Sequence, residues 1–296
     1  MTSPEDWVSR QERLARLARS NLFFIGGAPR SGTTWLQRLL DSHPAIGCRG
    51  EGLFMQHLAA PLDAMMTERR ARLDEKNTTV FGQAEGFPLP DQDDSDMLLA
   101  TAILLALDRA RAGRTVQAIG EKTPENVFLF PRLKRLFPSA RLIIIARDPR
   151  DVLSSAWHFF HQPAAGEDPD TAKAGFIRLA LPSLQAGTRQ TLALRERYPA
   201  DCMVVTYESL RAAPEREAAA LFRFLGVSDH ADTVAQAVAR TAFTALSGGR
   251  PPGTPQDGAF LRSGIVGGWR ATFTPAMSDL ILNELGWAFP LFGWQP

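Results

Sequence analysis

Cysteine is scarce in this chain: only Cys48 and Cys202 occur among its 296 residues. Two cysteines are too few for a disulfide framework, so we expect a reducing compartment. Neither the cysteines nor the five histidines cluster at a spacing that is typical of zinc ligands. The sequence therefore predicts no metal site.

An excess of charge of one sign is also missing. The 33 Lys and Arg residues and the 32 Asp and Glu residues leave a formal net charge of +1, which argues against broad binding to nucleic acid or to a membrane surface. Any anion site must therefore be built from locally placed arginines and lysines. No apolar run approaches the roughly 20 residues of a membrane span, and the N-terminus lacks the apolar core of a signal peptide. We expect a cytoplasmic protein without a membrane span.

A glycine-rich turn is the most informative feature that is present. Residues 26–44 read GGAPRSGTTWLQRLLDSHP and follow a short apolar run, Leu22–Gly26. A strand, a glycine-rich turn and a helix in this order are the context of a phosphate-binding loop. Thr33 stands where the nucleotide P-loop has its lysine, and the nearest cation is Arg30. This loop suits a single phosphate with a neighbouring anionic group better than a polyphosphate with its metal; the alternative is a turn that binds nothing.

Two further apolar runs are followed by helical patterns, at Leu142–Ala146 and Met203–Thr206. Strands that alternate with helices predict the α/β class, with a central parallel sheet flanked by helices on both faces. Because no stretch reads as a convincing boundary, we expect residues 1–296 to form a single P-loop-type domain.

Two other segments carry candidate anion ligands. ARDPRDVLSS places Arg147 at the end of a predicted strand and Ser155 eight residues later, and ligands gather at such strand ends in open α/β sheets. FLRSGIVGGWR places Arg262, Ser263 and Gly264 after a flexible Pro- and Gly-rich stretch, residues 247–258, which we expect to be a mobile lid. Each segment taken alone also fits a turn with a solvated arginine.

Taken in order, these segments resemble the sulfotransferase superfamily that uses 3′-phosphoadenosine 5′-phosphosulfate (PAPS). PRSGTTWL resembles its 5′-phosphosulfate loop, ARDPRDVLSS its 3′-phosphate segment, and FLRSGIVGGWR its C-terminal R-K-G-x-x-G-x-W segment, with Ser263 in place of the lysine. VVTYESL and RTAFTAL resemble segments whose Tyr and Thr contact the nucleotide. The resemblance implies that the donor is bound by Arg30, Ser31, Gly32, Thr33, Thr34, Trp35, Arg147, Ser155, Tyr207, Thr241, Arg262, Ser263 and Gly264.

The segment GEKTPEN bears on the catalytic base. In the segment that this one resembles, cytosolic members that act on small molecules carry the sequence K-T-H, and its histidine is the base. This chain has Pro124 in place of that histidine. GEKTP instead resembles the bacterial, carbohydrate and tyrosylprotein branches, in which a glutamate after the loop helix is the base. Glu51 matches that position, and Lys122 would stabilise the bridging oxygen. Glu51 could also simply cap a loop, Glu121 could be a structural carboxylate paired with Lys122 or an arginine, and Glu121 or His161 could be the base instead.

The resemblance implies an enzyme that moves a sulfuryl group in line from PAPS to a hydroxyl or amine acceptor and releases adenosine 3′,5′-bisphosphate (PAP). The alternatives are a P-loop kinase of a small metabolite that uses ATP–Mg²⁺, and a nucleotide-binding regulatory module without catalysis. The acceptor stays open among small molecules, sugars, lipids and peptides, as does the oligomeric state. We expect residues 61–115 and 163–174 to line the acceptor pocket.

Overall fold

Five short strands form one parallel sheet at the centre of the fold. The structure is a computed structural model, and it describes residues 4–82, 85–161, 166, 168–256, 259 and 261–296. The strand order is β2-β3-β1-β4-β5, and the register pairs Phe23 of β1 with Gly120 of β3 and with Arg141 of β4. The strands are β1 (Asn21–Gly26), β2 (Ile46–Cys48), β3 (Ala118–Lys122), β4 (Arg141–Ala146) and β5 (Cys202–Thr206). The predicted α/β class with a central parallel sheet is confirmed.

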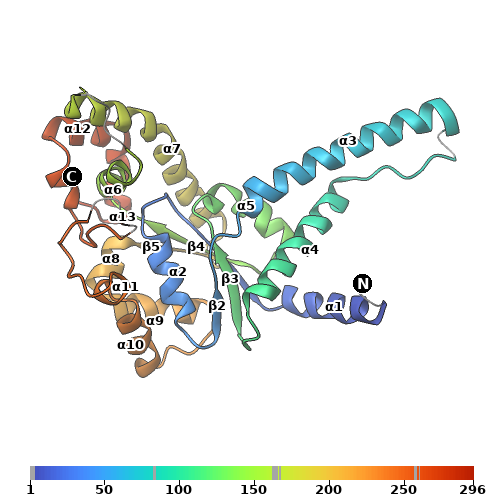
Figure 1. Cartoon of the computed structure of the whole chain (residues 1–296), viewed down its shortest axis with the longest axis horizontal. Helices are drawn as coiled ribbons and strands as arrows, with labels where there is room; N and C mark the ends of the chain where they lie inside the picture. Colours follow the sequence, from blue (N-terminus) through green and yellow to red (C-terminus); the bar gives the residue numbers. More distant parts are fainter. Residues whose placement is uncertain (1–3, 83–84, 162–165, 167, 257–258, 260) are drawn as a thin grey trace.

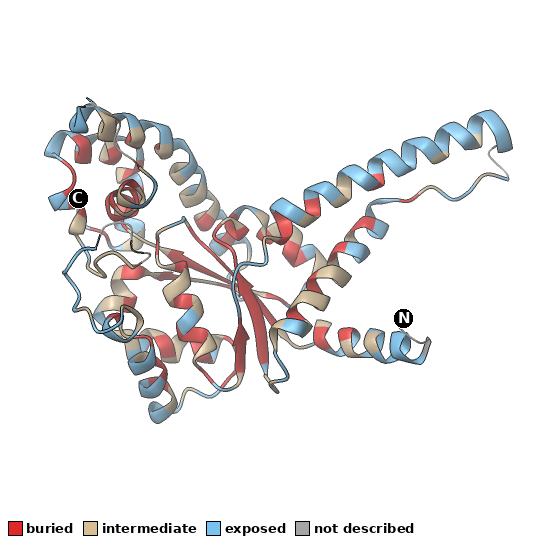
Figure 2. Cartoon of the chain, in the orientation of Figure 1, coloured by how far each residue is buried: buried red, intermediate tan, exposed pale blue. Residues whose placement is uncertain are grey.

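The side chains of β1 alternate between two apolar layers, because successive residues of a strand point to opposite faces. Leu22 and Phe24 join one buried cluster, and Phe23 and Ile25 join the other. Helices lie on either side of the strands in Figure 1, and Figure 2 shows the strands buried between these helices. The first cluster includes residues of α1 (Pro4–Ala18), α4 (Gln92–Ala110) and α5 (Asn126–Leu136), and the second residues of α2 (Thr33–Asp41), α8 (Tyr207–Ala212), α9 (Pro214–Phe224) and α10 (Ala231–Arg240).

A third buried cluster lies beyond β4 and β5. Leu153, Ile177, Trp269 and Ile281 pack together there and fix the helix that follows β4. This cluster holds α6, the helix after β4, against the C-terminal part of the chain. Its elements are α6 (Pro149–Phe160), α7 (Pro169–Arg197), a 3₁₀ turn (Gly268–Ala271) and α12 (Pro275–Leu285), and the shorter helices α11 (Phe243–Leu246) and α13 (Phe289–Phe292) lie nearby in the sequence.

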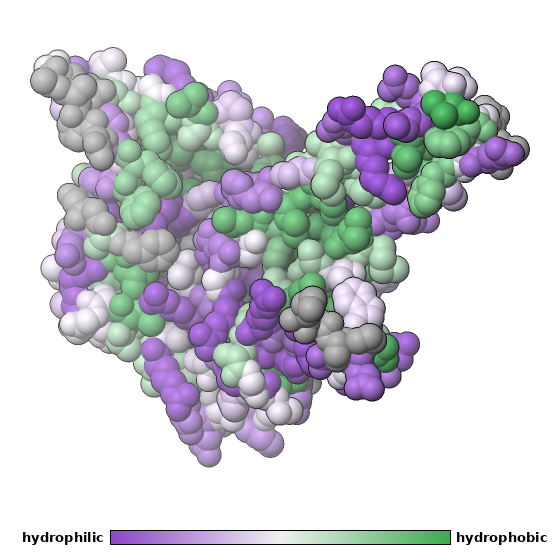
Figure 3. All heavy atoms as spheres, turned by 45° about the vertical axis from the view of Figure 1, so that its right-hand side comes forward, coloured by the Kyte–Doolittle hydropathy of each residue, from purple (hydrophilic) through white to green (hydrophobic). Residues whose placement is uncertain are grey.

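Helices α3 (Ala60–Lys76) and α4 form an arm that projects from the body, as Figures 1 and 2 show. Met66 is the single buried residue of α3 among those described. The apolar run 97–107 is buried on one face only: Leu99 and Ile103 lie in the core, whereas Met97 is 69% exposed. Figure 3 shows apolar surface on the arm and beside its base. Within the described ranges, no helix is both long and apolar enough to cross a membrane.

Candidate active site

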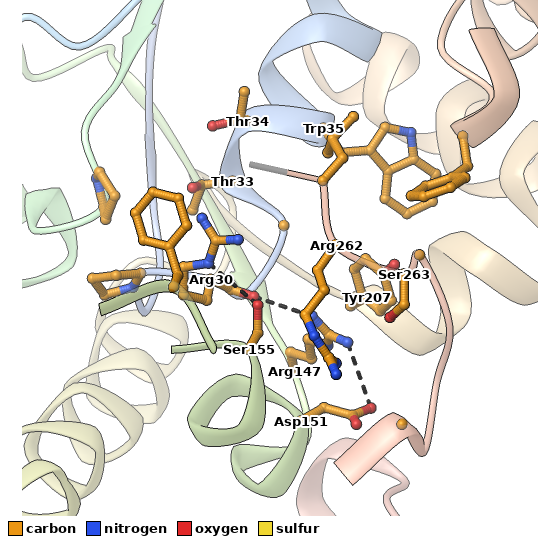
Figure 4. A pocket seen from close by; sticks show the side chains of 18 of the residues that line it. Arg30, Thr33, Thr34, Trp35, Arg147, Asp151, Ser155, Tyr207, Arg262 and Ser263 are labelled. Atoms are coloured by element: carbon orange, nitrogen blue, oxygen red, sulfur yellow. Dashed lines mark hydrogen bonds and ion pairs between the residues drawn. The ribbon is translucent and has the colours of Figure 1, made fainter. Parts of the chain in front are cut away.

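A cavity of about 390 Å³ lies at the carboxyl ends of the strands. The loop after β1, the start of α6, the start of α8 and residues 261–264 meet around it, as Figure 4 shows. Ligands of open α/β sheets bind at this edge. Of the residues singled out from the sequence, those that line it are Arg30, Gly32, Thr33, Thr34, Trp35, Glu51, Arg147, Ser155, Tyr207, Thr241, Arg262, Ser263 and Gly264.

The loop between β1 and α2 is shaped for an anion. Gly32 has a φ of 103°, and a Cβ there would lie 2.8 Å from the Tyr207 ring, so only glycine fits without a shift. Gly32 caps α2 without a side-chain hydrogen bond, which leaves the first N–H groups of the helix and its positive end to attract a negative group. The Ser31 hydroxyl is buried without a hydrogen-bond partner, and Ser31 is not among the described residues that line the cavity. An anionic ligand oxygen suits the open end of α2.

Arg30 also has a left-handed backbone, with a φ of 71°, which is costly for a residue with a side chain. Its Nε donates to the Ser155 hydroxyl at 3.2 Å, and its guanidinium lies 4.2 Å from the centre of the Phe159 ring. Burial first, and the positive charge of Arg147 second, hold the pKa of Arg30 below its usual value. Two arginines that face one cavity favour an anion between them.

Arg147 ties two distant loops together. Its guanidinium donates to the carbonyl oxygens of Arg30 at 3.2 Å and Ile265 at 3.0 Å, and it stacks 4.2 Å from the centre of the Tyr207 ring. The buried carboxylate of Asp151 lies 3.6 Å from the same guanidinium. Figure 4 shows Arg30, Arg147 and Arg262 gathered around Ser155. Arg30 and Ser155, which are 125 residues apart in the sequence, therefore meet in the cavity.

Asp151 also holds the C-terminal loop, and sequence reasoning missed it. Its carboxylate accepts hydrogen bonds from the backbone N–H groups of Gly267 at 2.8 Å and Trp269 at 3.0 Å. Arg147 lies just before α6 and Asp151 in its first turn, so their spacing of four residues could have indicated this pair. Other cavity-lining residues that the sequence did not single out are Pro29, Glu125, Phe159, Phe160, Arg211 and Phe243.

Trp35 and Tyr207 form an aromatic wall of the cavity. Their rings meet edge to face with centres 5.4 Å apart, and the Trp35 indole donates to the carbonyl oxygen of Thr241 at 3.0 Å. Burial raises the pKa of the Tyr207 phenol. The hydroxyl of Thr241 itself is bonded to the Ala237 carbonyl in its own helix, so Thr241 supplies backbone and shape to the wall.

Arg250 organises the segment that carries Arg262. Its guanidinium donates to the carbonyl oxygens of Leu261 and Arg262, and Gly253 N–H donates to the Ser263 carbonyl at 2.8 Å. Phe260 and residues 257–258 of the expected lid lie outside the described residues. The described part, residues 247–256, is thus bonded to the segment that lines the cavity.

Glu51 and Lys122 form an ion pair, of which Glu51 lines the cavity and Lys122 is not among the described lining residues. Glu51 lines the cavity with an exposed side chain, and the buried Lys122 ammonium, at the end of β3, is ion-paired with its carboxylate. Glu121 points elsewhere: its carboxylate accepts from Gly52 N–H at 3.0 Å and from the Thr123 hydroxyl at 2.9 Å, and burial raises its pKa. These bonds come from neutral donors, and Lys122 forms its ion pair with Glu51, not with Glu121.

His161 and the two stretches expected to line the acceptor pocket lie away from the cavity or partly outside the described residues. His161 is not among the described residues that line the cavity, and it stacks on Trp157 with ring centres 3.6 Å apart. None of the described residues of 61–115 lines this cavity or the second cavity described below, and the α3–α4 arm projects from the body; a contact of this stretch with the acceptor stays a prediction. Of the other expected acceptor stretch, 163–174, residues 163–165 and 167 lie outside the described residues, and none of the described ones lines either cavity.

Comparisons with known proteins agree with this geometry. A protein-family model described as “Sulfotransferase family” matches residues 23–232 of this chain. A putative protein-tyrosine sulfotransferase of Caenorhabditis briggsae is 29% identical over 205 residues, which cover 69% of this chain and 65% of that protein. Protein-tyrosine sulfotransferase 2 of Gallus gallus is 30% identical over 216 residues, 72% of this chain and 53% of that protein. The chain thus spans between about half and two thirds of these two relatives.

Solved structures share the fold. The mouse sulfotransferase SULT7A1 complexed with PAP has a TM-score of 0.56 at 17% identity, with 94% of this chain and 88% of that chain covered. Sulfotransferase STF9 from Mycobacterium avium has a TM-score of 0.57 at 14% identity, with 98% and 81% covered.

Proposed function

Because this chain belongs to the sulfotransferase family, we propose that it transfers a sulfuryl group from PAPS to a hydroxyl or amine acceptor and releases PAP. The observation that carries the proposal is the meeting of three segments, around Arg30, Arg147 and Arg262, at one cavity on the carboxyl edge of the sheet. Two relatives with the same fold were solved with PAP, the mouse enzyme and a retinol dehydratase.

The donor would be held at both of its anionic ends. The loop from Arg30 to Trp35, with the unpaired Ser31 hydroxyl and the open N-terminus of α2, would bind the 5′-phosphosulfate. Arg147, Ser155 and Arg262, with Ser263 and Gly264, would bind the 3′-phosphate, and the walls at Tyr207 and Thr241 would border the adenine. A cation-lined 3′ site would reject nucleotides without the 3′-phosphate, because its polar groups would stay unpaired.

The chemical step assigns one role to each member of the Glu51–Lys122 pair. PAPS supplies a sulfuryl group on a phosphate leaving group. The Glu51 carboxylate accepts the acceptor proton as the new O–S (or N–S) bond forms and the bridging S–O bond breaks. Lys122 donates to the bridging oxygen, which takes the electron pair and leaves with PAP.

Family membership disfavours the kinase alternative. We propose in addition that residues 1–296 form one sulfotransferase-like domain, since helices from both halves of the sequence cover the same sheet, and that the protein is cytoplasmic. A thermal-shift panel tests the donor assignment: PAP without metal should raise the melting temperature more than AMP or ATP–Mg²⁺. A larger rise with ATP–Mg²⁺ would overturn it.

A further inference from the structure

A second cavity, of about 310 Å³, adjoins the donor cavity. It lies between the loop after β1, the start of α5, α6 and α7. The two cavities share five lining residues, Pro29, Pro124, Glu125, Arg147 and Phe160. We call this second cavity the α7 groove. The shared lining includes Pro124, two residues after Lys122 in the sequence, so the groove borders the cavity that Glu51 lines.

The α7 groove offers little for polar recognition. Among the described residues that line it, Glu125 and Arg147 are the charged ones. Arg147 already donates to two backbone carbonyls of the donor cavity. The hydroxyls of Thr188 and Thr191 are bonded to carbonyl oxygens of α7 itself, both at 2.8 Å. A sugar, whose several hydroxyls each need a partner, would lose hydrogen bonds with water on entering.

Apolar side chains supply the walls. Val127, Val152 and Leu184 line the groove, together with Phe292 and Trp294 near the C-terminus. Two large aromatic residues of the lining are exposed to solvent: Phe128 by 44% and Phe160 by 60%. Exposed aromatic side chains in a concave site typically become buried by an apolar ligand.

Building on the proposed function, we infer that the α7 groove binds the acceptor and that the acceptor is an alcohol or phenol with an extended apolar skeleton. Its hydroxyl would lie at the shared border near Pro124, and its skeleton would lie along α7. An acidic peptide is disfavoured, because the groove presents the carboxylate of Glu125 and no cation beyond the engaged Arg147 among its described lining.

Gly187 provides a direct test of the groove. It lies in α7, and a Cβ there would meet only the Phe128 ring, at 3.6 Å. Gly187→Leu would therefore place a side chain in the groove, and it replaces a poor helix former by a good one. Gly175→Leu is the matched control, because Gly175 lies in the same helix, is exposed, and would have nothing within 4 Å of an added Cβ.

The experiment is calorimetric titration of the PAP-saturated protein with three probes: 4-pentylphenol, methyl β-glucoside, and a peptide with tyrosine between aspartates. We expect 4-pentylphenol to bind tightest. Gly187→Leu should weaken the binding of 4-pentylphenol by about tenfold or more, because the added side chain occupies the groove and the probe can then enter only if the surrounding side chains shift. Gly175→Leu should not weaken it. PAP affinity, measured first for each variant, should be the same in all three proteins.

Each other outcome overturns a defined part of the inference. If the glucoside or the peptide binds tighter than 4-pentylphenol, or if 4-pentylphenol does not bind, the acceptor class is wrong. If Gly187→Leu binds 4-pentylphenol like the Gly175→Leu control, the groove is not the acceptor site. If PAP itself does not bind the wild-type protein, the proposed function fails instead, and this is seen before any acceptor is added.

Discussion

The buried ammonium of Lys122 is ion-paired with the exposed carboxylate of Glu51, 71 residues away in the sequence. One partner ends a central strand, and the other lies in the loop after the edge strand β2. The pair places a carboxylate on the wall of the donor cavity and a buried cation directly behind that carboxylate, as its ion-pair partner. Sulfuryl transfer requires this combination, because one reacting oxygen loses a proton while the other gains negative charge.

Glu51→Gln should lower turnover by ~10²–10⁴-fold, the usual effect of removing a general base, since glutamine keeps the shape but cannot accept the proton. PAP affinity should hardly change, because the proposed role of the carboxylate is to accept the proton of the acceptor and not to hold the nucleotide. The measurement is transfer of labelled sulfate from PAPS to an aliphatic alcohol such as 1-octanol, whose hydroxyl is not ionised at neutral pH. Retention of most activity in this variant, with loss in His161→Ala, would mean that Glu51 is not the base.

Lys122→Ala should also lower turnover, and its effect should not add to that of Glu51→Gln. Groups that act as a unit show strongly non-additive losses, so the double variant should fall no more than about tenfold below the slower single variant. Single-turnover rates of the four proteins give this comparison. Fully multiplicative losses would mean that the two residues act independently.

The strands with apolar sequences were predictable, and two others were not. The runs expected at 22–26, 142–146 and 203–206 correspond to β1, β4 and β5. Strand β3 was not predicted, because its sequence, AIGEK, ends in two charged residues. All five of its residues are nevertheless buried, since Asn126, Thr123 and Glu51 satisfy those charges from other elements. Such compensation depends on the tertiary fold.

The candidate anion ligands were predictable to a similar degree. The motifs singled out three of the cavity-lining arginines, Arg30, Arg147 and Arg262, but not Arg211. The contacts of Asp151 with backbone N–H groups 116 and 118 residues away left no local pattern. The direction of the α3–α4 arm was equally hidden, because the apolar face of α4 fits either a buried helix or a pocket wall.

Arg250→Ala should weaken PAP binding although Arg250 is not among the described residues that line the donor cavity. The substitution removes the hydrogen bonds that fix the carbonyls of Leu261 and Arg262. We expect a loss of about tenfold, since the loop would then have to be ordered on binding. Hydrogen exchange of residues 247–256 should slow on adding PAP to the wild-type protein, as expected for a lid.

A matched control for this variant is Arg69→Ala, on the exposed face of the arm, which should leave PAP binding unchanged. Equal PAP affinity of Arg250→Ala and Arg69→Ala would show that Arg250 does not organise the nucleotide loop. Unchanged hydrogen exchange would remove the lid while leaving the donor assignment in place.

His43 should make stability depend on pH. The ring is buried against Phe222, accepts from Ala45 N–H at Nδ1, and contacts the Ser228 carbonyl through Nε2. The neutral ring is thereby favoured, and burial holds the pKa of His43 below its usual value. The unfolded chain therefore takes up a proton first as the pH falls below about 6.5.

This contribution of His43 should thus be complete above about pH 6.5 and decline below it, by at most about 1.4 kcal/mol per pH unit. Urea unfolding of the wild-type protein and of His43→Gln between about pH 5 and 7.5 measures the difference in slope. The same slope in both proteins would contradict the assignment.

Calorimetric titration with PAP and with AMP, in the absence of metal, tests the donor assignment most directly. We predict that PAP binds much more tightly than AMP, and that Arg147→Ala weakens PAP binding by on the order of 2 kcal/mol, the size of a lost charge-assisted hydrogen bond, with little change for AMP. Equal affinities of the wild-type protein for PAP and AMP would contradict it.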